Sequence, residues 1–132
     1  MKRFIKLLTV ITLSLPTLVL AVPPKQLVTH NNTDYESNAF IDGNIPSQHP
    51  TRAHADNKVY WAAVKMACFG HIVNGRCSAL IKIATNTSTP LDIGMLAMDL
   101  NTGDITPKVI SANGFTITVN GPAETTITQD QP

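Results

Sequence analysis

The sequence predicts a mostly β protein, a small antiparallel β-sandwich or partly open barrel with one hairpin disulfide, preceded by an extended N-terminal arm. Three observations lead to this class. The chain starts with an export signal, its two cysteines lie close together, and short segments of alternating apolar residues are separated by Gly, Asn and Pro turns. A length of 132 residues gives room for one domain.

Residues 1–21 have the three-part layout of a secretory signal peptide. Three basic residues fall in the first six positions, an uncharged apolar run follows over residues 7–20, and Ala21 offers a small residue for cleavage. The run of about 14 residues is shorter than the roughly 20 that span a bilayer. We therefore expect an exported protein, secreted or periplasmic, with no membrane span in the mature chain. The lysine-rich leader suggests a bacterial source.

Cleavage after Ala21 changes the charge balance. Three of the ten basic residues leave with the leader, so seven basic residues remain against nine acidic ones. A net charge near −2 provides no excess of Lys and Arg for a phosphate backbone or an anionic membrane. We therefore expect no nucleic-acid partner.

Cys68 and Cys77 are the only cysteines, and an even count in an exported chain predicts that they form a disulfide. If the two face each other across a hairpin, antiparallel pairing places Met66 opposite Ala79 on the disulfide face. Residues 69–76 would then form the loop, with an Asn-Gly pair that adopts positive φ at low cost.

Residues 22–57 contain many Pro, Asn and Ser residues and show no helical or alternating apolar period. Such a composition predicts an extended, partly disordered arm. The β domain is then expected over residues 58–128, followed by a loose tail at residues 129–132. This division leaves about 75 residues to form the core, a size at which one disulfide matters.

The apolar residues of segment 57–67 fit two structures. The hairpin register favours a strand, whereas a helix capped by Asp56 or Asn57 is the alternative, which Ala62 and Ala63 support. We favour the strand. Further along the chain, residues 91–100 are expected to form one strand or two short ones.

Asn113-Gly114 is the strongest hairpin signal in the chain, because a type I′ turn needs positive φ at both central residues. The turn would pair Ala112 with Phe115, after which apolar residues alternate with threonines as in a half-buried strand. Residues 125–128 are expected to add a last edge strand. The total is five to seven strands.

The candidate ligand-binding residues are Trp61, Phe69, His71 and Arg76. In the hairpin register, Trp61 and Phe69 share the face away from the disulfide, where they would form an aromatic platform with Lys65 if that face is open. A tryptophan buried in the core is the alternative. His71 and Arg76 lie in the loop that the disulfide closes. These residues favour a protein or glycan surface as the partner.

No catalytic residue, metal ligand or cofactor is predicted. The chain has no HExxH, CxxC or GxSxG pattern, and His49 and His54 are not at the spacing that places two ligands on one helix face. Asp99 and Asp104 flank a turn, where aspartate commonly accepts backbone hydrogen bonds. We interpret them as turn formers.

These features favour an exported, non-enzymatic β module that binds a protein or glycan surface. Small size also disfavours an enzyme, because a pocket that excludes water is hard to build from about 75 ordered residues, and a protein or glycan surface is favoured over a small ligand. Two alternatives stay open. One is a small exported hydrolase that uses His71 with an aspartate, and the other is a structural subunit that assembles by strand addition.

Overall fold

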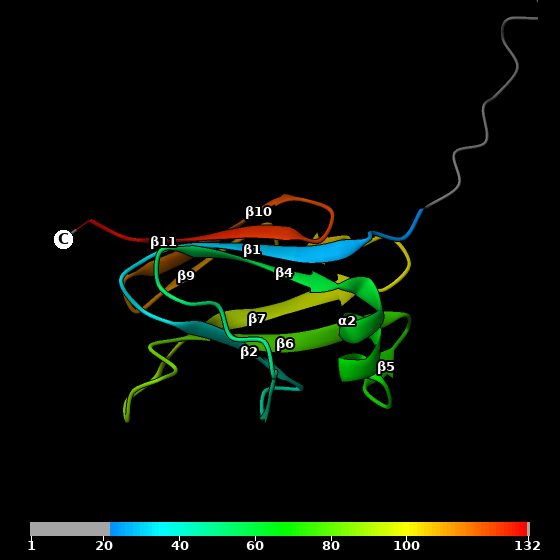
Figure 1. Cartoon of the computed structure of the whole chain (residues 1–132), viewed down its shortest axis with the longest axis horizontal. Helices are drawn as coiled ribbons and strands as arrows, with labels where there is room; N and C mark the ends of the chain where they lie inside the picture. The colour runs from blue at the N-terminus through cyan, green and yellow to red at the C-terminus, as the bar shows by residue number, and fades with distance from the viewer. Residues whose placement is uncertain (1–21, 132) are drawn as a thin grey trace, which may run out of the picture.

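The computed structural model describes residues 22–131, which form two β-sheets packed face to face with one short helix at one end (Figure 1). The first sheet has the strand order β4-β1-β11-β10-β9. Its strands are β1 (Gln26–Asn32), β4 (Ala55–Tyr60), β9 (Val109–Ala112), β10 (Phe115–Gly121) and β11 (Glu124–Gln129). The expected signal peptide lies outside the described residues.

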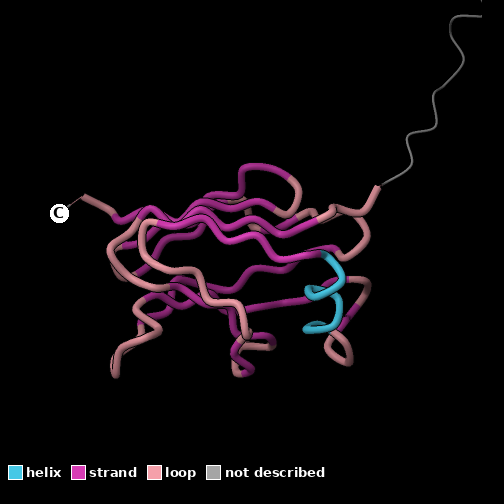
Figure 2. The backbone as a smooth tube through the Cα atoms, viewed as in Figure 1, coloured by secondary structure: helices cyan, strands magenta, loops and turns pink. Residues whose placement is uncertain are grey.

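The second sheet has the order β3-β2-β6-β7-β8, with β5 paired to the beginning of β6. Its strands are β2 (Ser37–Ile41), β3 (Ile45–Pro46), β5 (Ile72–Val73), β6 (Arg76–Ile83), β7 (Leu91–Asp99) and β8 (Ile105–Thr106). The helix, α2 (Trp61–Cys68), lies at the end of the sandwich where β4 finishes (Figure 2). The fold class is confirmed, although eleven strands within residues 22–131 exceed the expected five to seven.

The hairpin at Asn113-Gly114 forms as predicted. Both residues have positive φ, 56° and 89°, and Ala112 pairs with Phe115. Phe115 turns toward the core and the following residues alternate between buried and more exposed positions. The last strand differs from its prediction, because β11 lies in the middle of its sheet between β10 and β1. Its pairing with β1 is parallel, whereas the other strand pairs of the described structure are antiparallel.

The predicted N-terminal arm is wrong, because residues 22–57 supply β1, β2, β3 and half of β4. The physical reason is that buried polar groups in this segment are hydrogen-bonded. Asn31 has 0% exposure, and its side-chain amide donates to the carbonyls of Tyr35 and Thr51 at 2.7 and 3.3 Å. Its oxygen accepts from the backbone N–H and hydroxyl of Thr33. Polar composition therefore did not mean solvation here.

Segment 57–67 is divided between strand and helix. β4 ends at Tyr60, and α2 starts at Trp61 without a side-chain cap, so neither expected capping residue fills that role. The predicted hairpin register, with Met66 opposite Ala79, is wrong. β6 is already paired with β2 on one side and β7 on the other, so this segment has no free edge of β6 to join. Alanine-rich sequence instead forms a helix.

The core consists of two clusters of buried residues. The first lies at the helix end and comprises Ile41, Trp61, Val64, Cys68, Cys77, Leu100 and Ala123. The second comprises Ile83, Ile93, Leu96, Ile105, Phe115, Ile117 and Ile127. Among the described residues, no helix is long and apolar enough to cross a membrane.

Candidate functional site

The predicted disulfide is present and anchors one end of the molecule. Cys68 ends α2 and Cys77 lies near the start of β6, with their Cα atoms 5.9 Å apart. Between them, the N–H of His71 donates to the Cys68 carbonyl at 2.8 Å, and Val73 pairs with Arg76 across a two-residue turn. The disulfide therefore joins a helix to a strand rather than two strands of a hairpin, and backbone hydrogen bonds brace the loop that it closes.

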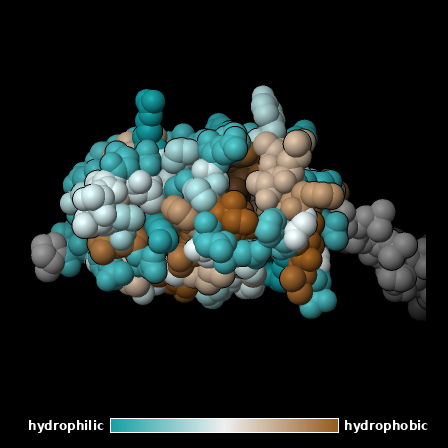
Figure 3. All heavy atoms as spheres, turned by 90° about the horizontal axis from the view of Figure 1, so that it is seen from below, coloured by the Kyte–Doolittle hydropathy of each residue, from teal (hydrophilic) through white to brown (hydrophobic). Residues whose placement is uncertain are grey.

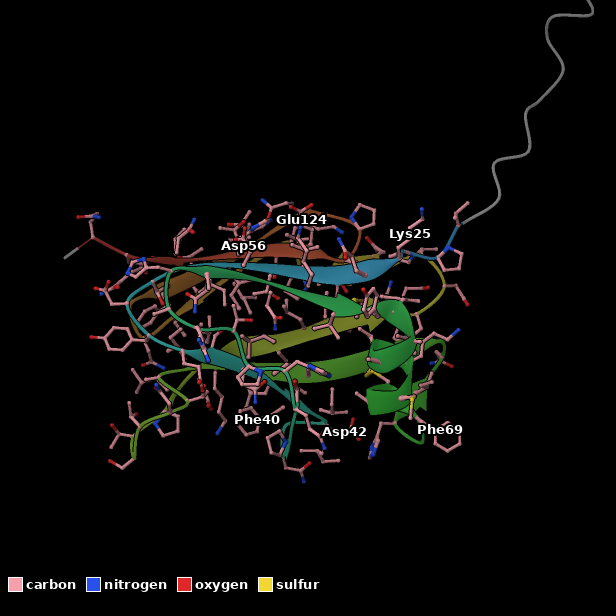
Figure 4. All side chains as sticks on the ribbon, in the orientation of Figure 1. Lys25, Phe40, Asp42, Asp56, Phe69 and Glu124 are labelled. Carbon is pink, nitrogen blue, oxygen red and sulfur yellow. A yellow bond between two sulfur atoms is a disulfide. The ribbon has the colours of Figure 1, made fainter. Side chains whose placement is uncertain are left out.

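Apolar side chains around this disulfide face the solvent. Met66, Phe69 and Val73 are 79, 82 and 70% exposed, and Ile72 is also exposed. We call these four residues the apolar tip. Figure 4 places Phe69 at the end of the molecule near α2 and β5, pointing away from the sheets. Because exposed apolar residues that gather in one rigid segment are uncommon in soluble proteins, the tip is the strongest candidate for a recognition surface.

Trp61 does not contribute to this surface. Its side chain is 6% exposed, and its Nε1–H donates to the carbonyl of Leu100 at 3.2 Å inside the first core cluster. The expected aromatic platform of Trp61 and Phe69 is therefore wrong, and the alternative of a core tryptophan is correct. The helix explains the difference, because it turns Trp61 inward while Phe69 follows its last residue.

His71 and Arg76 point toward opposite sides of β6. The Nδ1 atom of His71 lies 2.6 Å from the carboxylate of Asp42, in the turn between β2 and β3. Arg76 donates to the carboxylate of Asp104 at 3.4 Å and to the hydroxyl of Thr106 at 3.2 Å, on the side of β7 and β8. The structure thus brings His71 to an aspartate but does not bring His71 and Arg76 together.

His30 joins three strands on the outer face of the first sheet. Its Nδ1 lies 2.8 Å from Asp56 of β4 and its Nε2 lies 2.6 Å from Glu124 of β11. These hydrogen bonds to two carboxylates raise the pKa of His30 above its ordinary value of 6.5. Both ring nitrogens donate when the imidazole is protonated, so the cation fits this position. Asp56 and Glu124 are labelled in Figure 4.

Of the two aspartates predicted to form the turn, Asp99 does so, whereas the Asp104 carboxylate accepts from the side chains of Lys108 and Arg76 instead. Asp99 accepts the backbone N–H groups of Asn101 and Thr102 at 2.8 and 2.9 Å, and these bonds lower its pKa. The Lys108 ammonium, 2.6 Å away, lowers the pKa of Asp104. Within residues 22–131, no three His, Cys, Asp or Glu side chains form a group suited to a metal ion.

Three members of the apolar tip, Met66, Ile72 and Val73, were not among the predicted binding residues. Met66 was expected on the disulfide face of a strand, and Ile72 and Val73 were treated as ordinary loop residues. The sequence did contain a signal for Val73, because this residue precedes Asn74-Gly75, a pair that favours a tight turn. The two residues have φ values of 53° and 76°, and Val73 therefore lies at the end of a hairpin. The exposure of Met66 could be predicted only if this segment was known to form a helix.

Two packed sheets, a short helix and a helix-to-strand disulfide define a small disulfide-bonded β-sandwich. A family model described as the type II secretion system substrate NttC matches residues 1–130. The chain belongs to this NttC family and is an exported, secreted protein.

A solved structure supports the same assignment. The crystal structure of the Legionella pneumophila type II secretion system substrate NttC has a TM-score of 0.80 to this chain and 58% sequence identity. The match covers 81% of this chain and 99% of that one. No curated protein matches this chain in the comparison with such sequences.

Proposed function

We propose that this exported protein is a non-enzymatic binding module that recognises a partner protein through the apolar tip. The observation that supports this proposal is the 82% exposure of Phe69 in a segment that the disulfide and backbone hydrogen bonds hold in place. Large apolar side chains at the centre of an interface contribute most of its binding energy when a partner removes them from water. A braced segment also loses little conformational freedom on binding.

The composition of the tip favours a protein over a glycan. Phe69, Met66 and Val73 offer apolar area and no hydrogen-bonding group, whereas a sugar presents many hydroxyls that need polar partners. Lys65 lies exposed on the neighbouring turn of α2, so a positive charge accompanies the apolar surface, as in a polar rim. A partner with an apolar pocket and an acidic border fits this surface best.

A photo-crosslinking residue at position 73 of the secreted protein identifies the partner by mass spectrometry, and surface plasmon resonance then measures its affinity. We expect Phe69→Ser to weaken binding by roughly 30-fold or more, as for a hot-spot residue. Val73→Ser should also weaken it. Val109→Ser is the matched control, because Val109 is 58% exposed on β9, away from the tip. Unchanged affinity of Phe69→Ser, or displacement of the partner by free sugars, would contradict the proposal.

A hydrolase that uses His71 is a second candidate, because one observation favours it. The 2.6 Å contact between His71 Nδ1 and Asp42 resembles the pairing of a general base with an orienting carboxylate. A screen of the wild-type protein against ester, peptide and glycoside substrates tests it. Activity that His71→Ala abolishes and Phe69→Ser retains would support the hydrolase, whereas an inactive wild type would exclude it for those substrates.

A further inference from the structure

The two core clusters leave a cavity of about 150 Å³ between the sheets. Its lining includes Ile41 and Val64 from the first cluster and Leu96 and Ile117 from the second. Figure 3 shows the molecule hollowed on the face seen from below, with hydrophobic surface inside the hollow. The cavity therefore occupies the position where a continuous core would otherwise join the two clusters.

Small side chains account for the hollow. Ala39 of β2, Ala63 and Ala67 of α2 and Ala79 of β6 all line it. Four larger apolar residues of the lining pack against the core clusters but are only partly buried. They are Leu27, Val59, Ile81 and Met98. Apolar side chains that remain wetted inside a sandwich lose part of the stabilisation that full burial would give. An apolar ligand would restore it.

Polar groups stand where the loop between β3 and β4 meets the cavity. The Asn57 side chain donates to the His49 carbonyl at 2.9 Å, and the Asn38 side chain donates to the Ser47 carbonyl at 2.9 Å. These bonds hold the loop in place. His49, an exposed residue at this edge of the cavity, is the one lining residue that carries a titratable side chain, since the lining includes no Asp, Glu, Lys or Arg and its two cysteines form the disulfide. An imidazole donates to a carboxylate and, when protonated, also pairs with its charge.

We propose that the cavity binds a short straight-chain fatty acid, with its hydrocarbon chain between the sheets and its carboxylate at His49. The size supports this class, because an apolar cavity of about 150 Å³ takes a molecule such as benzene, so a chain of roughly six to eight carbons fits. An apolar lining with a few polar groups at one side is the usual form of a small-ligand site. This binding goes beyond the proposed recognition of a protein by the tip.

The cavity also revises the expectation that the domain is too small for a ligand pocket. That expectation assumed about 75 ordered residues, but residues 26–60 join the sandwich and supply much of the lining. Leu27, Thr29, Ala39 and Val59 come from this segment. Strands β1, β2 and β4 thus supply lining residues that a disordered arm would not have supplied.

Titration calorimetry of the wild-type protein with butanoate, hexanoate, octanoate and dodecanoate tests the proposal. We expect affinity to rise about fourfold per methylene up to octanoate, as each additional group leaves water, and to rise no further at dodecanoate. Nuclear Overhauser contacts should join octanoate methylenes to the methyl groups of Ile81 and Met98. The absence of saturable binding, affinity independent of chain length, or contacts only with the tip would overturn the proposal.

Cavity-filling variants locate the bound chain. Ala79→Leu should reduce octanoate affinity at least tenfold, while Ala62→Leu, on the exposed side of the same helix as Ala63, should leave it unchanged. If Ala79→Leu fails to fold, Ala63→Leu makes the same test. His49→Ala should weaken octanoate binding severalfold but leave octanol binding unchanged. Full octanoate affinity in a folded, filled variant would overturn the proposal.

The tip variant separates this proposal from the proposed function. Phe69→Ser should bind octanoate like the wild type, because Phe69 does not line the cavity. Loss of octanoate binding in Phe69→Ser would assign the ligand to the tip and overturn the cavity site. If Phe69→Ser loses binding to the protein partner but binds octanoate like the wild type, the two sites are separate, as both proposals predict.

Discussion

Residues 22–57 and residues 109–129 build the same sandwich by different chemistry. The second segment forms β9, β10 and β11 with the alternating apolar pattern of half-buried strands, and its inward residues Phe115, Ile117 and Ile127 are buried. The first segment buries mainly polar side chains, and Ile41 is its one buried apolar residue among those described. The comparison teaches that an apolar period identifies a strand, but that its absence does not identify an arm.

The buried polar residues of the first segment depend on one another. Asn31, Thr33, Ser37 and Thr51 are all nearly inaccessible to solvent. Ser37 and Thr51 exchange two backbone hydrogen bonds, of 2.9 and 2.8 Å, and Asn31 donates to the Thr51 carbonyl. No buried side-chain nitrogen or oxygen within residues 22–131 lacks a partner. The network therefore replaces part of the apolar packing that the second segment supplies.

The largest effect is expected from Asn31→Ala, which removes the centre of this network. The variant removes one hydrogen bond from each of the carbonyls of Tyr35 and Thr51, and it removes the oxygen that accepts from the backbone N–H and hydroxyl of Thr33, at a cost of about 3 kcal/mol in the free energy of unfolding. Urea denaturation of the mature protein measures it. The neighbouring exposed residue offers the control, because Asn32→Ala should change stability by less than about 0.5 kcal/mol. Equal stability of the two variants would show that residues 22–57 do not contribute to the fold.

Reduction of the disulfide is expected to have the next largest effect. A loop closed by residues nine apart contributes roughly 2.5–3 kcal/mol in the chain-entropy model, which corresponds to a decrease in Tm of about 10 °C. Differential scanning calorimetry with and without reductant measures it, and the double variant Cys68→Ala with Cys77→Ala should behave like the reduced protein. An unchanged Tm would mean that the disulfide adds nothing to the stability of this end of the molecule.

Sequence patterns predicted the elements whose signals are local. The hairpin at Asn113-Gly114 was predicted correctly, because the positive φ that both residues adopt is a local preference of this residue pair. The pairing of Cys68 with Cys77 followed from their number. Phe69 belongs to the loop predicted over residues 69–76 and is exposed, although the platform that it was expected to form with Trp61 is absent.

The errors came from partners that are distant in the sequence. β11 lies in the centre of its sheet because β1, more than 90 residues earlier, pairs with it. Trp61 is buried because the edges of β6 are taken by β2 and β7, which leaves the preceding segment to form a helix. The cavity combines residues of both segments, so no local pattern predicted it.

A smaller effect is expected at the well-predicted hairpin. Gly114 has a φ of 89°, which a side chain adopts at a cost, and nothing near it would obstruct an added methyl group. Gly114→Ala should therefore cost about 1 kcal/mol from conformation alone. Gly121→Ala also meets open space but does not have this φ, so it should cost less in urea denaturation. Equal costs would assign the effect to strand propensity rather than to the turn.

The smallest effect is expected at His30, which connects β1 to β4 and β11. Because its folded-state pKa is raised above 6.5, its contribution to stability is fully present below that value and is lost as the pH rises through the folded pKa. The Tm difference between wild type and His30→Gln should thus be greatest near pH 6 and smallest near pH 9. We expect a few degrees at most, since the ion pairs are partly exposed. A difference that does not vary with pH would contradict the charge on His30.

Every recognition feature of the structure depends on residues 26–60 folding into the sandwich, because they line the cavity and lead into the helix beneath the tip. Amide hydrogen exchange of the mature protein, read by mass spectrometry or NMR, measures this directly. The amides of β1 that pair with β4 and β11 should be protected to a degree similar to those of β10. Exchange of the β1 amides at the rate of an unfolded peptide, while β10 stays protected, would contradict it.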